Sequence, residues 1–220
     1  MKKSLLSIAL TSLLASTAFT SIQVSATEGL SANVAMTSNY LWRGLEQTNG
    51  AAAISGGIDY AAESGFYVGT WVSNADWAAG MTYELDIYGG YAGETENFSY
   101  DLGFVHYAYP DSIDDVDFTE VNASVSLGVF TFGYAVLANA KGVDFGDDSY
   151  LSVDAEFELA SEMALTLHIG AGTDDFYAGE EFVEYGASLS KSNFTFGVSQ
   201  TDLNDSDVKV YVSYAIDIDL

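Results

Sequence analysis

The chain has 220 residues, a formal net charge of −26 and only six lysine and arginine residues. Phosphate binding needs clustered basic side chains, so this composition argues against a nucleic-acid partner. The chain contains no cysteine, which excludes thiol catalysis, thiolate metal sites and a disulfide scaffold. With 49% hydrophobic and 14% aromatic residues, it reads as a folded, β-rich protein rather than an acidic disordered one.

Residues 1–26 are predicted to be a signal peptide that is cleaved from the mature protein. Lys2 and Lys3 precede an apolar core at residues 5–14, and Val24-Ser25-Ala26 supplies the small residues of a cleavage site. The apolar core is too short to span a bilayer. The signal directs the protein through the inner membrane of a bacterium.

Residues 27–220 are predicted to form a single domain. This part of the chain has no apolar run long enough for a membrane helix, so it would have to enter a membrane as a closed barrel. Its cations are Arg43, Lys141, Lys191 and Lys209.

About twelve strands are predicted, because apolar and polar residues alternate along successive stretches of the chain. A strand points successive side chains to opposite faces, so this period gives one apolar face and one polar face. The predicted strands, in chain order, are 30–43, 51–60, 66–73, 81–91, 98–109, 120–127, 129–139, 151–159, 163–169, 182–191, 194–200 and 208–220. Three of them (66–73, 98–109 and 129–139) have small or aromatic residues on both faces, so ten or fourteen strands also remain compatible with the sequence.

The predicted connections alternate between short and long. The short ones are 61–64, 93–97, 128, 160–162 and 190–193; the long ones are 44–50, 74–80, 110–117, 141–148, 173–181 and 201–207. Short periplasmic turns and longer outer loops are typical of barrels in the bacterial outer membrane. The sequence therefore predicts an all-β, antiparallel transmembrane β-barrel with acidic outer loops, in contact with membrane lipid and lipopolysaccharide.

Aromatic residues near the predicted strand ends share the apolar face. Amphipathic rings at these depths form the interfacial girdles of membrane barrels, although aromatic residues also favour strands in general. The candidate girdle residues are Tyr40, Trp42, Tyr60, Tyr83, Tyr91, Phe98, Tyr100 and Tyr214.

The segment from Ser38 to Pro110 carries a family resemblance. Its matching stretches are Ser38-Asn39-Tyr40-Leu41-Trp42-Arg43-Gly44-Leu45-Glu46-Gln47-Thr48, Gly56-Gly57-Ile58-Asp59-Tyr60, Ser64-Gly65-Phe66-Tyr67-Val68-Gly69-Thr70-Trp71, Ser73-Asn74, Glu84-Leu85-Asp86-Ile87-Tyr88-Gly89-Gly90-Tyr91 and Tyr107-Ala108-Tyr109-Pro110. With these the chain resembles a proteobacterial family of conserved hypothetical proteins described as TorF-type porins. The resemblance implies an outer-membrane location and a channel role, without a defined substrate.

Insertion by the barrel assembly machinery is expected of such a protein. Barrels of this kind usually end in an aromatic residue, whereas this chain ends in Leu220. The alternation leading to that position is kept, so we interpret Leu220 as a conservative variant.

Charged residues on the polar parity are expected to line the lumen. They are Asp59, Glu84, Asp86, Glu120, Asp154, Glu156, Glu158 and Glu184, together with Arg43 and Lys209. Barrel closure pairs the first and last strands, so Arg43 and Lys209 are expected close together near the outer mouth. They would face Glu84, Glu120 and Glu184 at similar depth.

This arrangement predicts a channel for passive diffusion of small, preferentially cationic or neutral solutes, with Arg43 and Lys209 at its narrow region. In the alternative interpretation the two cations neutralise buried acids and close the lumen. The protein would then be a structural or surface-recognition barrel without a conducting pore.

An enzyme is a further, less favoured interpretation. His106 shares the apolar face, His168 shares the polar face, and no nucleophile elbow, zinc motif or phosphate loop is present, so an outer-membrane hydrolase has little support. No cofactor and no specific metal site are expected. The acidic loops are expected only to attract divalent cations loosely.

Overall fold

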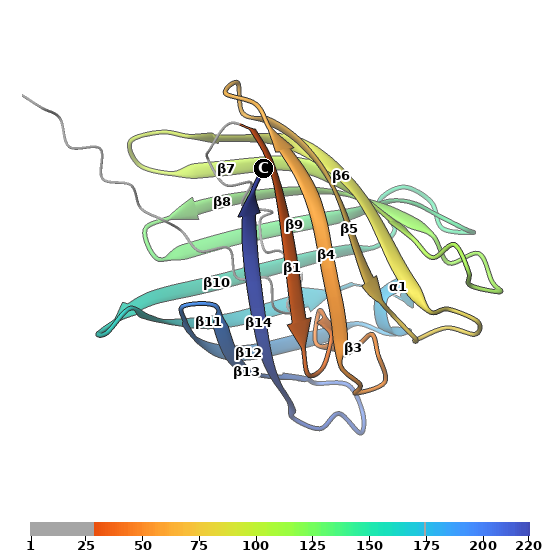
Figure 1. Cartoon of the computed structure of the whole chain (residues 1–220). Coiled ribbons are helices and arrows are strands. Elements are labelled where there is room, and N and C mark those ends of the chain that lie inside the picture. The colour runs from red at the N-terminus through yellow and green to blue at the C-terminus, as the bar shows by residue number, and fades with distance from the viewer. Residues whose placement is uncertain (1–28, 174) are drawn as a thin grey trace, which may run out of the picture.

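A computed structural model describes residues 29–173 and 175–220, and the predicted signal peptide lies outside the described residues. Within them, twelve strands form one closed antiparallel barrel in the order β1-β14-β13-β12-β11-β10-β9-β8-β7-β6-β5-β4. The first strand closes the barrel by pairing with both the second and the last barrel strand, as the red, orange and blue ribbons of Figure 1 show. The predicted fold class and strand number are confirmed.

The elements follow the predicted ranges closely, with one exception near residue 38. The barrel strands are β1 (Gly29–Thr37), β4 (Ala53–Ala61), β5 (Phe66–Asn74), β6 (Tyr83–Glu94), β7 (Ser99–Ala108), β8 (Phe118–Leu127), β9 (Phe130–Ala140), β10 (Ser149–Leu159), β11 (Met163–Gly172), β12 (Phe182–Lys191), β13 (Phe194–Thr201) and β14 (Lys209–Asp219). A separate two-stranded hairpin is made by β2 (Leu41–Trp42) and β3 (Leu45–Glu46), and α1 (Asp175–Ala178) is a single helical turn. Within the described residues, no helix has the length and hydrophobicity needed to cross a bilayer.

The alternation of side chains fixes which face points outward. Apolar residues of the predicted apolar parity are exposed on the outer surface; among them Ile54 is 65% exposed. Many polar residues of the opposite parity, such as Glu84 and Glu120, are buried inside. An apolar surface that encircles a barrel would drive aggregation in water, whereas it matches the hydrocarbon of a bilayer.

The connections separate the barrel into two ends. One end, which we call the short-turn end, carries Gly29 and Leu220. Its connections between strands are residues 62–65, 95–98, 128–129, 160–162 and 192–193. The opposite, long-loop end carries residues 38–52, 75–82, 109–117, 141–148, 173–181 and 202–208. At the short-turn end, Phe66, Tyr91, Tyr100 and Phe98 form a chain of ring contacts, as expected of an interfacial girdle.

The prediction that the first strand runs from 30 to 43 was wrong. Strand β1 ends at Thr37, and the β2–β3 hairpin then folds back into the barrel interior, where Leu41 is only 1% exposed. Tyr40 and Trp42 therefore do not belong to the lipid-facing girdle. The alternation of apolar residues in the sequence continues past Thr37, because the hairpin also carries aromatic rings. These rings pack against the inside of the barrel instead of facing lipid.

Tyrosine rings fill part of the interior, and glycines on neighbouring strands leave room for them. A Cβ at Gly197 would overlap the ring of Tyr211, and a Cβ at Gly170 would overlap the ring of Tyr150. Each pair lies on adjacent strands, so the glycine supplies a recess for the ring. Buried polar groups and two apolar clusters, one around Leu137 and one around Phe182, fill other parts of the interior.

Candidate functional site

The lumen near the long-loop end is the candidate site, because buried charged groups gather there from many strands. Glu84, Glu120 and Glu184 each lie close to the beginning of a strand that starts at this end, in β6, β8 and β12. All three are no more than 2% exposed. At Glu120 the β8–β9 ladder shifts register, a type of irregularity that re-aims side chains beside functional sites.

The tip of the β2–β3 hairpin carries Arg43 into this acidic region. Arg43 (φ 51°) and Gly44 (φ 74°) form the two-residue turn of the hairpin, and positive φ at both positions is the pattern of a type I′ turn. A Cβ at Gly44 would lie 2.8 Å from Thr201 Cγ2 and 3.0 Å from Glu184 Oε2. The absence of a side chain at Gly44 therefore lets the hairpin tip approach the barrel wall.

Arg43 is clamped to Glu120 by two parallel hydrogen bonds. Its Nη1 and Nη2 atoms each donate at 2.8 Å to a separate oxygen of the Glu120 carboxylate, a bidentate arrangement. The guanidinium carbon lies 4.3 Å from the ring centroid of Trp42, 4.1 Å from that of Tyr150 and 4.5 Å from that of Tyr177. Arg43 is completely buried.

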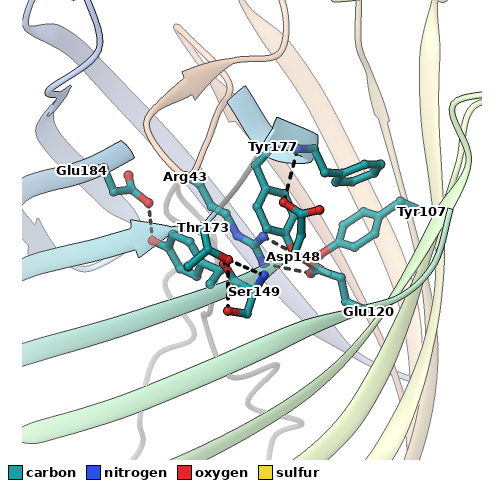
Figure 2. A network of polar contacts seen from close by, with 10 residues as sticks. Arg43, Tyr107, Glu120, Asp148, Ser149, Thr173, Tyr177 and Glu184 are labelled. Carbon is teal, nitrogen blue, oxygen red and sulfur yellow. Dashed lines mark hydrogen bonds and ion pairs between the residues drawn. The ribbon is translucent and has the colours of Figure 1, made fainter. Parts of the chain in front are cut away.

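Neighbouring hydroxyls complete the surroundings of this ion pair. Tyr177 donates to Glu120 Oε1 at 2.6 Å and Tyr107 donates to Oε2 at 3.3 Å, and Figure 2 shows both rings beside the carboxylate. Burial by itself would lower the pKa of Arg43, but the attraction to Glu120 outweighs it and raises the pKa above the ordinary arginine value. Arg43 therefore stays charged.

Lys209 holds the other strand of the hairpin. Its Nζ lies 3.3 Å from Glu46 Oε2, and Asn39 Nδ2 donates to Glu46 Oε1 at 2.8 Å. Both predicted lumen cations thus connect the hairpin to the barrel, but with different carboxylates: Arg43 with Glu120 of the wall, and Lys209 with Glu46 of the hairpin. Arg43 comes from the hairpin tip rather than from the barrel wall, while Lys209 begins β14 as predicted.

His168 forms a second bridge between two carboxylates inside the barrel. Its Nδ1 lies 2.7 Å from Asp154 Oδ1, and its Nε2 lies 3.4 Å from Glu184 Oε1. Tyr150 donates to the same Glu184 oxygen and lies 3.2 Å from Nε2. Among the described residues, these partners occupy both ring nitrogens, and none of them is a nucleophilic serine or threonine.

The strands β4 to β7 present carboxylates with a different environment, and we call this side the β4–β7 wall. Asp59 accepts hydrogen bonds from Tyr88 and Asn33, Asp101 accepts one from Tyr67, and Glu84 accepts one from Tyr40. Asp86 is buried too, and its Oδ1 has no hydrogen-bond partner among the described residues. Within that part of the chain, none of these four acids has a cation within ion-pair distance.

The opposite side is the β8–β12 wall, where Glu120, Asp154 and Glu184 meet Arg43 or His168. Two further predicted lining residues, Glu156 and Glu158, lie nearer the short-turn end of β10 and are exposed. His106 lies outside the lumen, in contact with Thr119 at 2.9 Å.

The acidic loops have structural roles of their own. Asp117 accepts a hydrogen bond from the Tyr109 backbone, and Asp202 accepts one from the Val183 backbone. Hydrogen bonds from Thr82 lower the pKa of Asp111 below its ordinary value. Among residues 29–173 and 175–220, no cluster of three or more potential metal ligands occurs.

The inward tyrosines were missed as site residues by sequence reasoning. Tyr67, Tyr88 and Tyr150 each donate to a lumen carboxylate. The available signal was parity, because Tyr88 and Tyr150 alternate with apolar neighbours in the same way as the acids do. Their acceptors lie on other strands, so the pairs themselves are not visible in the sequence.

A comparison with known proteins assigns the chain to a family. The model of a family of bacterial proteins of unknown function, Gcw_chp, matches residues 22–218. The chain belongs to the Gcw_chp family. For this Gcw_chp member the match extends well beyond the 38–110 segment in which the sequence resemblance was seen. No curated protein matches the chain in sequence.

Solved structures show that this Gcw_chp chain has a porin-like fold. The KdgM porin covers 87% of this chain and 98% of its own, with a TM-score of 0.54 and 8% identity. A KdgM porin in complex with disordered oligogalacturonate has the same coverage and identity and a TM-score of 0.55. A structure titled "Unveiling the Mechanism Behind the in-meso Crystallization of Membrane Proteins" covers 86% of this chain and 83% of its own, with a TM-score of 0.58 and 8% identity.

Proposed function

We propose that the protein is an outer-membrane channel for passive diffusion of small, preferentially cationic or neutral solutes. The β4–β7 wall carries this proposal, because its acids accept hydrogen bonds only from neutral groups among the described residues. Carboxylates that line a pore without paired cations attract cations and repel anions. The narrow region is where Arg43 and Lys209 hold the hairpin inside the lumen.

The fold supports the membrane setting of this proposal. The exposed apolar residues of the outer face contact lipid and lipopolysaccharide, the short-turn end faces the periplasm, and the long-loop end faces outside. In this setting the predicted signal peptide and the barrel assembly machinery deliver the chain, and divalent cations associate loosely with the acidic loops. The TorF-type resemblance supports the same channel role.

The charge of the lumen argues against an acidic sugar as solute. The similar KdgM porin was solved with oligogalacturonate, which is a polyanion. This chain has a net charge of −26 and carboxylates along its β4–β7 wall. Such a wall repels anions, so we do not transfer that ligand to this protein.

A closed barrel is the second candidate, and the burial of Arg43 favours it. The guanidinium is completely buried under three aromatic rings, so the hairpin fills part of the cross-section. In that case the ion pairs serve the stability of a structural or surface-recognition barrel.

Planar-bilayer recording of the purified full chain distinguishes the two. A channel gives single-channel steps, and under a KCl gradient its reversal potential shows preference for K⁺. Asp86→Asn is expected to shift this potential toward that of a non-selective pore, because it removes a buried, uncompensated carboxylate. Asp144→Asn, in an exposed loop, is the matched control and should leave the potential unchanged. Complete absence of steps at every salt concentration would refute the channel.

A further inference from the structure

A cavity of about 550 Å³ opens at the long-loop end, above the Arg43 clamp. Six rings line it, and we call this site the aromatic vestibule: Trp42, Trp77, Tyr109, Phe118, Phe176 and Tyr177. The rings come from the hairpin, from β8 and from loops 75–82, 109–117 and 173–181, so it is built by segments far apart in the chain. Its volume lies within the range of small-molecule sites.

The rings form a continuous series of contacts, which makes the vestibule a built surface rather than a gap between loops. Trp77 and Tyr109 lie with ring centroids 5.0 Å apart, and the corresponding distance between Phe118 and Phe176 is 5.1 Å. The series is completed by Tyr109–Phe118, Phe176–Tyr177, Trp42–Phe118 and Trp42–Tyr177. Tyr109 and Phe118 are almost fully buried, which fixes the positions of the rings that they contact.

Charged groups at the rim determine the sign of a ligand. Glu46, Asp115 and Asp117 line the cavity together with a single cation, Lys141. Glu46 is paired with Lys209 and Asp117 accepts a backbone hydrogen bond, whereas Asp115 has neither kind of partner among the described residues. The vestibule therefore has an excess of negative charge and one exposed carboxylate free to meet a ligand.

We propose that the aromatic vestibule binds small organic cations of the alkylammonium class. Ring faces attract a cation by their quadrupole, and they attract quaternary ammonium groups in particular, which cannot be strongly hydrated. Trp42 and Tyr177 already accept the Arg43 guanidinium on their faces, so Trp77, Tyr109, Phe118 and Phe176 are the rings that meet the ligand. Asp115 supplies the opposite charge. An anion is repelled by the same rim.

This proposal goes beyond passive diffusion, because it assigns a saturable site at the entrance. It also does not depend on an open pore. Protein that binds the cation in detergent but conducts nothing in a bilayer would refute the channel and leave the vestibule site standing. Protein that conducts but does not bind the cation would refute the vestibule site and leave the channel standing.

Choline and 3,3-dimethylbutan-1-ol provide the decisive pair of probes, because the two have the same shape and differ by one charge. We expect choline to produce a saturable change in tryptophan fluorescence and in calorimetry of the full chain in detergent. The neutral isostere should bind about tenfold more weakly or worse, given the size of a desolvated cation–π contact. Added NaCl should weaken choline binding, because the rim is screened.

Two variants, each with a matched control, locate the site. Asp115→Asn should weaken choline binding severalfold and leave the isostere unaffected, while Asp114→Asn, the exposed neighbour outside the cavity, should behave as the parent. Trp77→Leu should weaken choline binding, and Trp71→Phe, which removes an indole inside the barrel, should retain the fluorescence response.

Equal affinity for choline and its isostere would overturn the proposal, since it would indicate an apolar cavity without charge preference. The same holds for tighter binding of a neutral sugar such as glucose, or for no saturable response to choline. Equal effects of Asp114→Asn and Asp115→Asn would also contradict it, because a general surface potential would then explain the binding.

Discussion

Both walls of the lumen carry buried acids, but the partners of these acids differ from one wall to the other. On the β8–β12 wall, Glu120, Asp154 and Glu184 are matched by Arg43 and His168. On the β4–β7 wall, the carboxylates receive only hydroxyl or amide hydrogen bonds within the described residues. The first wall therefore anchors the tip of the hairpin by an ion pair, whereas the second wall contacts the hairpin only through neutral groups such as the Tyr40 hydroxyl. In the channel that we propose, the second wall supplies the negative charge that a solute meets. An acid on the polar parity can therefore either anchor an interior segment or contribute charge to the lumen. Which of the two it does depends on whether a basic side chain lies beside it.

The largest effect is expected from removing the hairpin, because the β8–β12 wall then loses the element that it anchors in the lumen. Replacing residues 40–47 with Gly-Ser should raise the single-channel conductance severalfold, since the lumen loses the buried tip with Arg43 and Trp42. Shortening the exposed loop at 144–147 is the control and should change little. Unchanged conductance in the hairpin variant would show that the narrow region lies elsewhere.

A matched pair of substitutions tests the difference between the walls directly. Glu120→Gln leaves Arg43 buried without its counter-charge and should lower the free energy of unfolding by about 3–5 kcal/mol. Glu84→Gln removes an equally buried carboxylate whose hydrogen-bond partners, Tyr40 and Tyr109, are neutral hydroxyls, and it should cost about 1 kcal/mol or less. Urea unfolding in lipid vesicles measures both. Similar losses in the two variants would contradict the distinction.

A smaller effect should be common to both walls, because both pack tyrosine rings against glycine. Gly170→Ala would collide with Tyr150, and Gly69→Ala would collide with Tyr88, so each should cost about 1–3 kcal/mol. In the same vesicle assay, the double variant Tyr150→Ala/Gly170→Ala should be no less stable than Tyr150→Ala alone. Additive losses in the double variant would show that the ring is not what excludes a side chain at Gly170.

Much of the barrel was predictable because its determinants are local. The alternation of residues and the contrast between short and long connections predicted a closed barrel, its outward face and about twelve strands. The ambiguous phase of strands β5, β7 and β9 left ten or fourteen strands open at that point. Most acids of both walls were also expected on the inward parity, but Asp101 was not among them, because the phase of its strand was ambiguous. These properties depend on period and spacing, which the chain displays directly.

The hairpin was not predictable, because its determinants are distant. Tyr40 and Trp42 continue the apolar rhythm of β1, so nothing local separates a lipid-facing ring from one that packs on Phe118 inside the barrel. The turn at Arg43 and Gly44 lacks the usual asparagine or aspartate signal of a type I′ turn. The ion pair that draws the tip inward joins residues 77 positions apart.

The tyrosine–glycine recesses have a consequence for how the strands find their partners. Tyr211 lies opposite Gly197, and a slip of two residues along β13 would bring it against Thr195 or Ser199, whose side chains occupy the space that the ring needs. A slip of one residue would turn the ring toward the hydrocarbon. Each recess therefore disfavours misaligned strand pairings. The tyrosine–glycine pairs thus help to select the native order of hydrogen bonds while the barrel closes.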